Sequence, residues 1–279
     1  MDYYRPATLK QALAIRANSH VRILAGGTDF YPALQDRPVI DPVLDISKVE
    51  ELRQIRAENE GWEIGANATW TDIQLAILPP AFDALKQAAH EVGSVQIQNR
   101  GTIVGNICNA SPAADGVPPL LILDASVVIA SHLGTRTQPL ADFIRGNRQT
   151  TLAPDELVTA IHIPKLSAVG TSNFIKLGAR KYLVISIAMA AVRIVSDGNT
   201  IINAAVAVGS CSAVAQRMSR LESRLVGFSL NNINKLDGIS ESIDELSPID
   251  DIRSPAIYRR HAAVQLVRSA VATAAGRPA

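Results

Sequence analysis

Cysteine is almost absent from this sequence of 279 residues, which contains only Cys108 and Cys211. An iron–sulfur cluster usually takes four thiolates, and structural zinc sites mostly take four closely spaced Cys or His ligands. Two cysteines far apart in sequence provide neither site. They also make no secreted disulfide framework, so we expect the reducing environment of the cytoplasm.

Aromatic and charged residues are also scarce. Aromatic residues make up 4% of the chain and charged residues 19%, and 27 Lys and Arg against 26 Asp and Glu give a net charge of +1. A nucleic-acid-binding protein needs a basic excess and often aromatic stacking platforms, so this class is excluded. The low charge has two open interpretations: a tight core, or a surface partly covered by partner subunits.

No apolar run is long enough to span a bilayer. The longest, Leu183 to Val195, contains Ser186 and Arg193 and falls short of the ~18 uninterrupted apolar residues that a membrane helix needs. The first six residues lack the basic start and apolar core of a signal peptide. We therefore expect a soluble cytoplasmic protein.

Several common functional motifs are missing. The chain contains neither G-x-G-x-x-G nor G-x-x-x-x-G-K-[ST], which disfavours a conventional Rossmann or P-loop nucleotide site. Its five histidines show no H-x-x-x-H pairing, and no G-x-S-x-G nucleophile elbow occurs. The sequence thus predicts no catalytic residue and no metal ligand in this chain.

The hydrophobic pattern predicts alternating helices and strands in the first half. Expected helices cover residues 8–16, 30–35, 69–77 and 81–92, and expected strands cover 21–25, 43–46, 52–57, 62–66, 127–130 and 157–164. A second domain begins near residue 173, with apolar runs at 185–195 and 200–208 joined by a turn, and helices at 213–225 and 255–275. Periodicity leaves open whether residue 185 starts a strand or a helix. Residues 93–115 and 237–251 are expected to be loops.

The turn after the first clear strand is the leading candidate site. Gly26 and Gly27 remove two side chains there, so the main-chain N–H groups of Gly27, Thr28 and Asp29 can face a diphosphate. Thr28 adds a hydroxyl donor. By itself a Gly-Gly turn is a weak signal.

The long polar segment from Gly101 to Asp115 is the second candidate. Gly101 and Gly105 permit close approach of a ligand to the backbone, and Asn106, Ser111 and Asp115 offer polar groups for ribityl or ribose hydroxyls. A loop of this length inside a domain is either functional or a misread element.

Three motifs occur together in a characteristic order. They are LAGGTD at residues 24–29, IQNRGTIVGNI at 97–107 and ASPAAD at 110–115. With PAT at the start of the first helix, DELV at 155–158 and F-x-K-x-x-x-R at 174–180, the chain resembles the FAD-binding medium subunit of the molybdenum hydroxylases, the family of xanthine and carbon monoxide dehydrogenases. The resemblance spans nearly the whole chain.

The resemblance implies an α+β fold of two domains. The first, 1–167, is a flavin domain of the vanillyl-alcohol-oxidase (PCMH) type with two lobes at about 1–57 and 58–167. The second, 168–279, is an α+β domain with a three-stranded sheet and helices.

The resemblance also implies the cofactor contacts. The first turn wraps the FAD diphosphate with Ile23, Leu24, Ala25, Gly26, Gly27, Thr28, Asp29 and Phe30. The second wall consists of Gly101, Thr102, Ile103, Val104 and Gly105, and Asp115 holds ribityl or ribose hydroxyls. Val92 and Val158 contact the cofactor, and Lys176 approaches the isoalloxazine ring.

One position departs from the family pattern. The family commonly reads Thr-Ile-Gly-Gly-Asn, and Val104 replaces the first of the paired glycines. Valine is costly at a positive φ. We therefore expect an extended backbone at Val104, with its side chain directed away from the ligand.

The implied function is that of an oxidoreductase flavoprotein in a heteromeric complex. Electrons come from a molybdopterin-binding large subunit through two [2Fe–2S] clusters of a small subunit, and FAD passes them to NAD, oxygen, a quinone or another acceptor. A xanthine, purine or similar heterocycle dehydrogenase is favoured slightly. The alternatives are a carbon monoxide or aldehyde dehydrogenase medium subunit, a stand-alone flavin oxidase and a non-catalytic assembly subunit.

Overall fold

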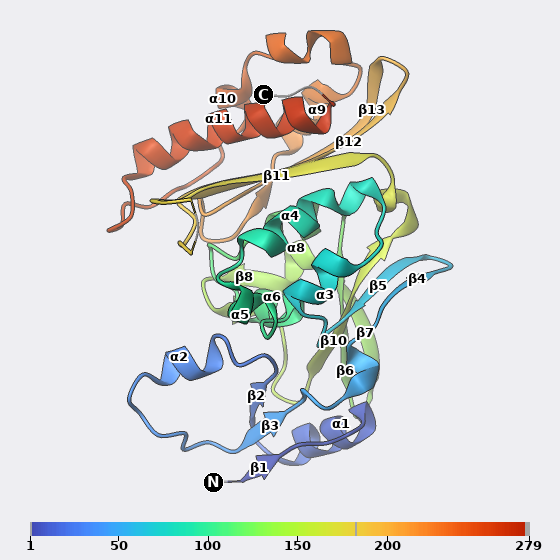
Figure 1. Ribbon diagram of the computed structural model, residues 1–279, viewed down its shortest axis with the longest axis vertical. Helices are drawn as coiled ribbons and strands as arrows, with labels where there is room; N and C mark the ends of the chain where they lie inside the picture. Colours follow the sequence, from blue (N-terminus) through green and yellow to red (C-terminus); the bar gives the residue numbers. More distant parts are fainter. Residues whose placement is uncertain (1, 182, 277–279) are drawn as a thin grey trace.

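Three layers of sheet and helix follow one another along the long axis of the molecule (Figure 1). The computed structural model describes residues 2–181 and 183–276. The N-terminal elements lie at one end, the middle of the chain forms the centre, and the C-terminal sheet and helices form the other end. None of the helices in these ranges is both long and apolar enough to cross a membrane.

The first layer is a small parallel sheet with strand order β1-β3-β2. Helix α1 connects β1 to β2. Thr8 caps this helix reciprocally with Gln11, as is typical of a Thr-x-x-Gln spacing. The short helix α2 connects β2 to β3. The bounds are β1 Tyr3–Tyr4, α1 Leu9–Asn18, β2 Arg22–Leu24, α2 Phe30–Leu34 and β3 Val43–Asp45.

The second layer is a five-stranded antiparallel sheet with strand order β4-β5-β10-β6-β7. The connection from β5 to β6 carries most of the helices of this layer. The bounds are β4 Ile55–Glu58, β5 Gly61–Gly65, α3 Trp70–Leu75, α4 Asp83–Glu91, α5 Val95–Gln98, α6 Ile103–Asn109, α7 Val117–Ile122, β6 Ser126–Ser131, β7 Gly134–Pro139, α8 Leu140–Phe143, β8 Ile144–Gly146, β9 Gln149–Thr150 and β10 Leu157–Pro164.

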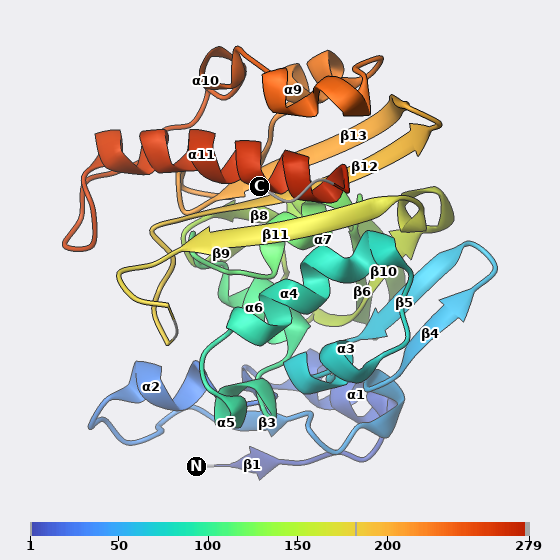
Figure 2. The ribbon, with the colours of Figure 1, turned by 45° about the horizontal axis from the view of Figure 1, so that its top comes forward.

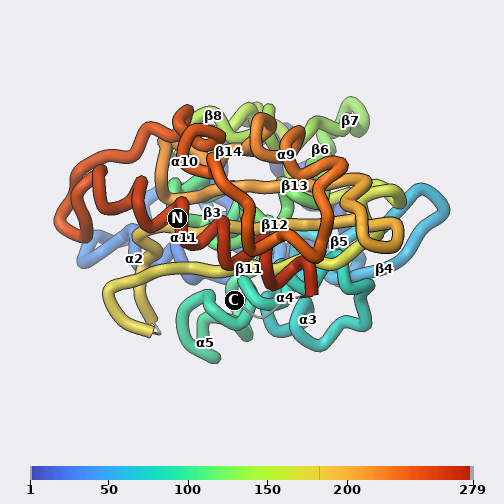
Figure 3. The backbone as a smooth tube through the Cα atoms, turned by 90° about the horizontal axis from the view of Figure 1, so that it is seen from above, coloured from blue at the N-terminus to red at the C-terminus, as the bar shows by residue number. Residues whose placement is uncertain are grey.

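The third layer is an antiparallel sheet with strand order β11-β12-β13-β14. Helix α11 lies along one face of β11 and β12, while α4 and α7 pack on the sheet from the second layer (Figures 2 and 3). The bounds are β11 Thr171–Leu177, β12 Ala188–Asp197, β13 Thr200–Gly209, β14 Gln216–Arg217, α9 Ser219–Leu225, α10 Ile239–Ser242 and α11 Ala256–Ala274.

Burial on both faces explains the apolar run that periodicity left ambiguous. In β12, Met189 and Ala191 face the core shared with the second layer, and Ala190 and Val192 face the core under α11. A strand covered on both faces reads as continuous apolar sequence. The run is therefore a strand from Ala188 onward, paired with β13 through the hairpin turn at 198–199.

Several expected bounds need correction. Residues 93–115 are not one loop, because α5 and α6 lie inside this segment. The helix expected from residue 213 begins only at Ser219, since Gln216 and Arg217 pair with β13. The segment 237–251 is not wholly a surface loop, because it contains α10 and buried side chains.

The sheets also refine two of the implied features. The C-terminal sheet has the three expected long strands, and the two-residue β14 pairs with β13 as a fourth. The lobe boundary expected at about residue 57 falls inside β4, which pairs with β5 of the second layer. The chain passes from the sheet of the first layer to the sheet of the second between Asp45 and Ile55.

Candidate functional site

The turn after β2 has main-chain donors without partners. Within the described chain, the N–H groups from Gly26 to Phe30 donate no hydrogen bond. Gly27 has φ of +78°, which turns the chain sharply. Successive free N–H groups in such a turn form a concave donor surface that suits an anion.

Gly26 serves a packing role that its sequence context did not reveal. A methyl group added at Gly26 would lie 1.8 Å from the carbonyl oxygen of Arg100 and 3.0 Å from the Cα of Gly101. The two candidate segments are thus in backbone contact. Glycine is needed here for that contact, and not only for the approach of a ligand to the turn.

The second segment begins α6. Thr102 is its N-cap, with its hydroxyl accepting a hydrogen bond of 3.0 Å from the N–H of Gly105, as expected for a threonine cap. An isolated bridge joins Thr102 to Thr69, and the N–H of Ile103 donates to the carbonyl of Ala68. The start of α6 is therefore anchored to the segment before α3.

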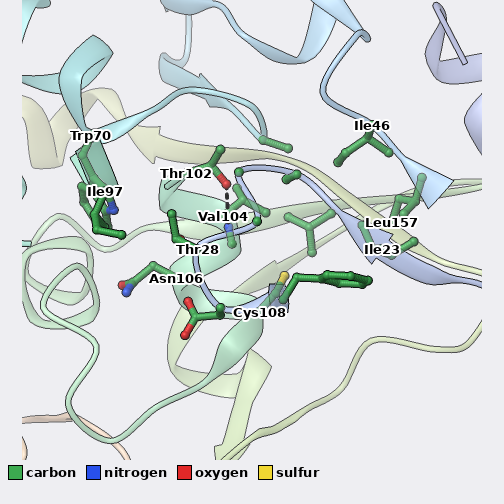
Figure 4. Close-up of a pocket in the computed structure, with 18 of the residues that line it drawn as sticks. Ile23, Thr28, Ile46, Trp70, Ile97, Thr102, Val104, Asn106, Cys108 and Leu157 are labelled. Atoms are coloured by element: carbon green, nitrogen blue, oxygen red, sulfur yellow. Dashed lines mark hydrogen bonds between the residues drawn. The ribbon is translucent and has the colours of Figure 1, made fainter. Parts of the chain in front are cut away.

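The two segments line one cavity of about 320 Å³ (Figure 4). This volume is in the range typical of small-molecule sites. The predicted residues in its wall are Ile23, Ala25, Gly26, Gly27, Thr28, Asp29, Phe30, Val92, Thr102, Val104, Gly105, Asn106 and Val158.

A second cavity of about 540 Å³ continues from the first. The two share Asp29, Val92, Ile97 and Asn106 in their walls. Among the predicted residues, Ser111 and Asp115 line only the second of these two cavities. The two cavities therefore adjoin along the residues that they share.

The remaining predicted residues lie behind the walls. Leu24 and Ile103 are buried in the protein, and Gly101 supports the wall, since a methyl group there would be 3.2 Å from the Thr28 hydroxyl. Lys176 does not line the first two cavities but is ion-paired to Asp115 behind the second.

Sequence reasoning missed seven residues of the first cavity, which share no polar motif. Most are apolar positions from separate elements, so only the tertiary fold brings them together. Leu157 could have been inferred as the neighbour of Val158. The seven are Ile46, Ala66, Trp70, Ile97, Cys108, Leu152 and Leu157.

The expectation for Val104 is wrong. The backbone there is helical, within α6, and the side chain lines the cavity while being 6% exposed. Because Val104 is not among the residues with positive φ, valine meets no backbone strain. It narrows the cavity instead of avoiding it.

Lys176 and Asp115 form a buried ion pair across two layers. The Lys176 Nζ lies 2.7 Å from the Asp115 Oδ2 and also donates to the carbonyls of Glu91 and Val184. Ser186 donates to the other oxygen of Asp115 at 2.6 Å. Both carboxylate oxygens are thus occupied by groups of the C-terminal half.

Burial changes two pKa values at the site. It raises the pKa of Asp115, an effect that Lys176 and Ser186 oppose. It raises the pKa of the Cys108 thiol to about 12, so this cysteine is protonated at neutral pH and is not a reactive thiolate.

Comparisons with known proteins agree with this architecture. Residues 1–166 match the FAD binding domain in molybdopterin dehydrogenase, and residues 173–274 match the CO dehydrogenase flavoprotein C-terminal domain. The nicotinate dehydrogenase FAD-subunit of Eubacterium barkeri is 40% identical over 194 residues, which cover 67% of this chain and 66% of that one. The glyceraldehyde dehydrogenase medium chain of Sulfolobus acidocaldarius is 32% identical, with 93% and 92% covered.

A solved structure shares the complete fold. A chain of the reconstituted CO dehydrogenase from Oligotropha carboxidovorans has a TM-score of 0.91 and 27% identity, with 99% of this chain and 98% of that chain covered. This chain therefore belongs to the family of FAD-binding medium subunits of the molybdenum hydroxylases, a class of oxidoreductases. The cofactor of this domain family is FAD.

Proposed function

We propose that this chain is the electron-transfer flavoprotein of a molybdenum-dependent dehydrogenase complex. The observation that carries the proposal is the run of free main-chain N–H groups from Gly26 to Phe30 at the wall of the first cavity. Bound FAD supplies the ability to take up electrons singly and release them in pairs. The protein supplies binding, orientation and electrostatics.

The free N–H groups and the Thr28 hydroxyl are the proposed donors to the FAD diphosphate. The nearest carboxylate, Asp29, accepts a hydrogen bond of 3.0 Å from the side chain of Asn109, which reduces its repulsion of an anion. The wall from Thr102 to Asn106 covers the other side. Donors without internal partners on one side and close-packed walls on the other fit this cofactor.

Asp115 and Lys176 are the proposed contacts of the ribityl or ribose hydroxyls and of the isoalloxazine ring. Their ion pair holds the ammonium of Lys176 at 6% exposure behind the second cavity. A buried positive charge near the flavin favours electron uptake by the ring. Asp115 thereby fixes the position from which Lys176 acts.

Each domain has its own proposed role. We assign FAD binding to the domain of residues 1–167. The C-terminal domain, residues 168–279, provides the residues that hold Asp115. Since two cysteines cannot hold a cluster, electrons arrive from the [2Fe–2S] clusters of a small subunit, which receives them from a molybdopterin-binding large subunit. A cytoplasmic location suits the two free cysteines.

The proposed substrate class of the complex is a purine or similar heterocycle, and the proposed acceptor is NAD or another oxidant. A relative that is 40% identical is named for nicotinate, a heterocycle. The alternatives are carbon monoxide and aldehydes, as in the names of other relatives, and a non-catalytic assembly subunit.

The test is the cofactor content of the purified complex. We expect a yellow protein that releases FAD on denaturation and contains molybdenum and iron in stoichiometric amounts. With NAD as acceptor, purines, nicotinate, carbon monoxide and glyceraldehyde are then compared as reductants. A colourless chain that fails to take up added FAD would refute the proposal, and its presence in the complex without flavin would support the assembly alternative.

A further inference from the structure

Trp70 is wedged between the start of α6, which lines the first cavity, and the start of α7. A methyl group added at Gly101 would lie 3.3 Å from Cδ1 of the indole, and one added at Gly116 would lie 2.6 Å from Cη2. These atoms are at opposite ends of the ring system. The indole therefore spans the distance between the start of α6 and the start of α7.

The backbone of Trp70 is held equally firmly. Its N–H donates to the carbonyl of Gly101 at 3.1 Å, and the preceding Thr69 caps α3 in a reciprocal pair with Asp72. The whole side chain is only 2% exposed. The position of the ring thus depends on both segments, and the separation of the segments depends on the ring.

The indole N–H of Trp70 has no acceptor within the described chain. Four side-chain atoms in that part of the chain are both fully buried and without a hydrogen-bond partner. The Trp70 Nε1 is not one of these four, so it is not enclosed by protein on every side. Trp70 lines the first cavity, beside Ile97 and opposite Ile23 and Leu157 (Figure 4). A tryptophan N–H in a protein interior usually finds a partner, and here the cavity is the space left to provide it.

We propose that Trp70 positions the cofactor in two ways, by setting the position of the cavity-lining start of α6 relative to the start of α7 and by donating its indole N–H to an acceptor of the bound FAD. The inference rests on the proposed function, because FAD is the ligand that supplies the acceptor. It assigns the role to a residue outside the three sequence motifs.

The first experiment needs no destabilising variant. The chain contains two tryptophans, so ¹⁵N-labelled protein of 29.8 kDa gives two indole N–H signals in a two-dimensional NMR spectrum. Trp62→Phe removes one signal and thereby assigns the other to Trp70. On addition of FAD to the flavin-free chain, we expect the Trp70 signal to move and the Trp62 signal to stay in place.

The second experiment compares FAD dissociation constants by calorimetry. Trp70→Phe is expected to weaken FAD binding about tenfold, because it removes the N–H and shortens the wedge. Trp62→Phe is the matched control, since Trp62 contacts Phe82 edge to face, with 5.6 Å between ring centroids, and does not line the cavity. It should leave FAD affinity unchanged.

A double-mutant cycle isolates the wedge. Gly116 has φ of −77°, which suits alanine, so Gly116→Ala acts through its contacts with Trp70 Cη2 and Asn106 Oδ1. We expect about tenfold weaker FAD binding in the wild-type background and a clearly smaller loss, about threefold, in the Trp70→Phe background, where the outer ring is gone and only the contact with Asn106 remains.

The outcomes separate the two proposals. If the chain binds FAD while the Trp70 signal stays in place and Trp70→Phe binds FAD as tightly as the wild type, the role of Trp70 is refuted and the proposed function stands. Equal effects of Gly116→Ala in both backgrounds refute the wedge. If the wild type binds no FAD, both the proposed function and this inference fail.

Discussion

Replacing Gly26 with alanine tests the contact that brings the two cofactor segments together. The added methyl group would lie 1.8 Å from the carbonyl oxygen of Arg100 and 2.6 Å from its carbon. Both are backbone atoms, which no side-chain rotation can move away. The segments must therefore separate by about 1.6 Å to reach ordinary contact.

Two effects of that separation can be estimated. Overpacking of this kind typically costs about 1–3 kcal/mol of folding free energy. A displacement of about 1 Å in a binding wall also weakens ligand positioning strongly, and we expect FAD affinity to fall about a hundredfold. Flavin fluorescence titration of the flavin-free chain measures the affinity, and thermal unfolding measures the stability.

Gly198→Ala is the matched control. Gly198 has φ of +52° and nothing within 4 Å of an added methyl group, so alanine there costs about 1–2 kcal/mol through its backbone alone. We expect it to lower stability without altering FAD affinity. Folded Gly26→Ala protein that binds FAD within about twofold of the wild type would refute the contact between the two segments.

Three further predictions concern ionisable groups. Asp115→Asn leaves the buried ammonium of Lys176 without its carboxylate and should cost about 3–5 kcal/mol in urea unfolding; a loss under about 1 kcal/mol would contradict a buried pair. Burial raises the pKa of the Cys108 thiol to about 12. Its reaction with a disulfide reagent at pH 8 should therefore be slow in the folded chain and slower still when FAD is bound. A reaction rate equal to that of the unfolded protein would argue against burial. Burial acts to raise the pKa of Asp251, but hydrogen bonds from main-chain N–H groups and from Arg259 together lower it to about 2. Its ionised form therefore stabilises the fold above about pH 4, and this contribution is lost between about pH 4 and pH 2. The melting temperature of Asp251→Asn should fall less than that of the wild type over this window, and equal falls would refute the assignment.

Local sequence signals predicted elements whose cause is local. The strand at 157–164 and the turn that joins the two apolar runs of the second domain lie where the pattern places them. The start of the helix that ends at Leu225 was wrong, because pairing of Gln216 with β13 depends on a distant strand. Pairing with a distant strand gives a segment of two residues no hydrophobic periodicity in its own sequence.

The candidate site divides in the same way. The turn at 26–29 and the segment 101–106 were found because main-chain contacts with a ligand require glycine and small polar residues at fixed spacing. The apolar wall from Ile46 to Leu157 was missed because an apolar position in a cavity wall has the same residue types as any other buried position. Val104 was misjudged because a sequence departure does not reveal whether its backbone is extended or helical.

The sequence by itself determined the family, the absence of a cluster-forming set of cysteines and the two segments that meet at the cavity. Only the tertiary structure decided that Gly26 touches Arg100, that Trp70 lies between the starts of α6 and α7, and that Lys176 is paired to Asp115. The physical reason is distance along the chain. Contacts between residues so far apart in sequence are set by how the layers pack, and their residue types alone are compatible with many other partners.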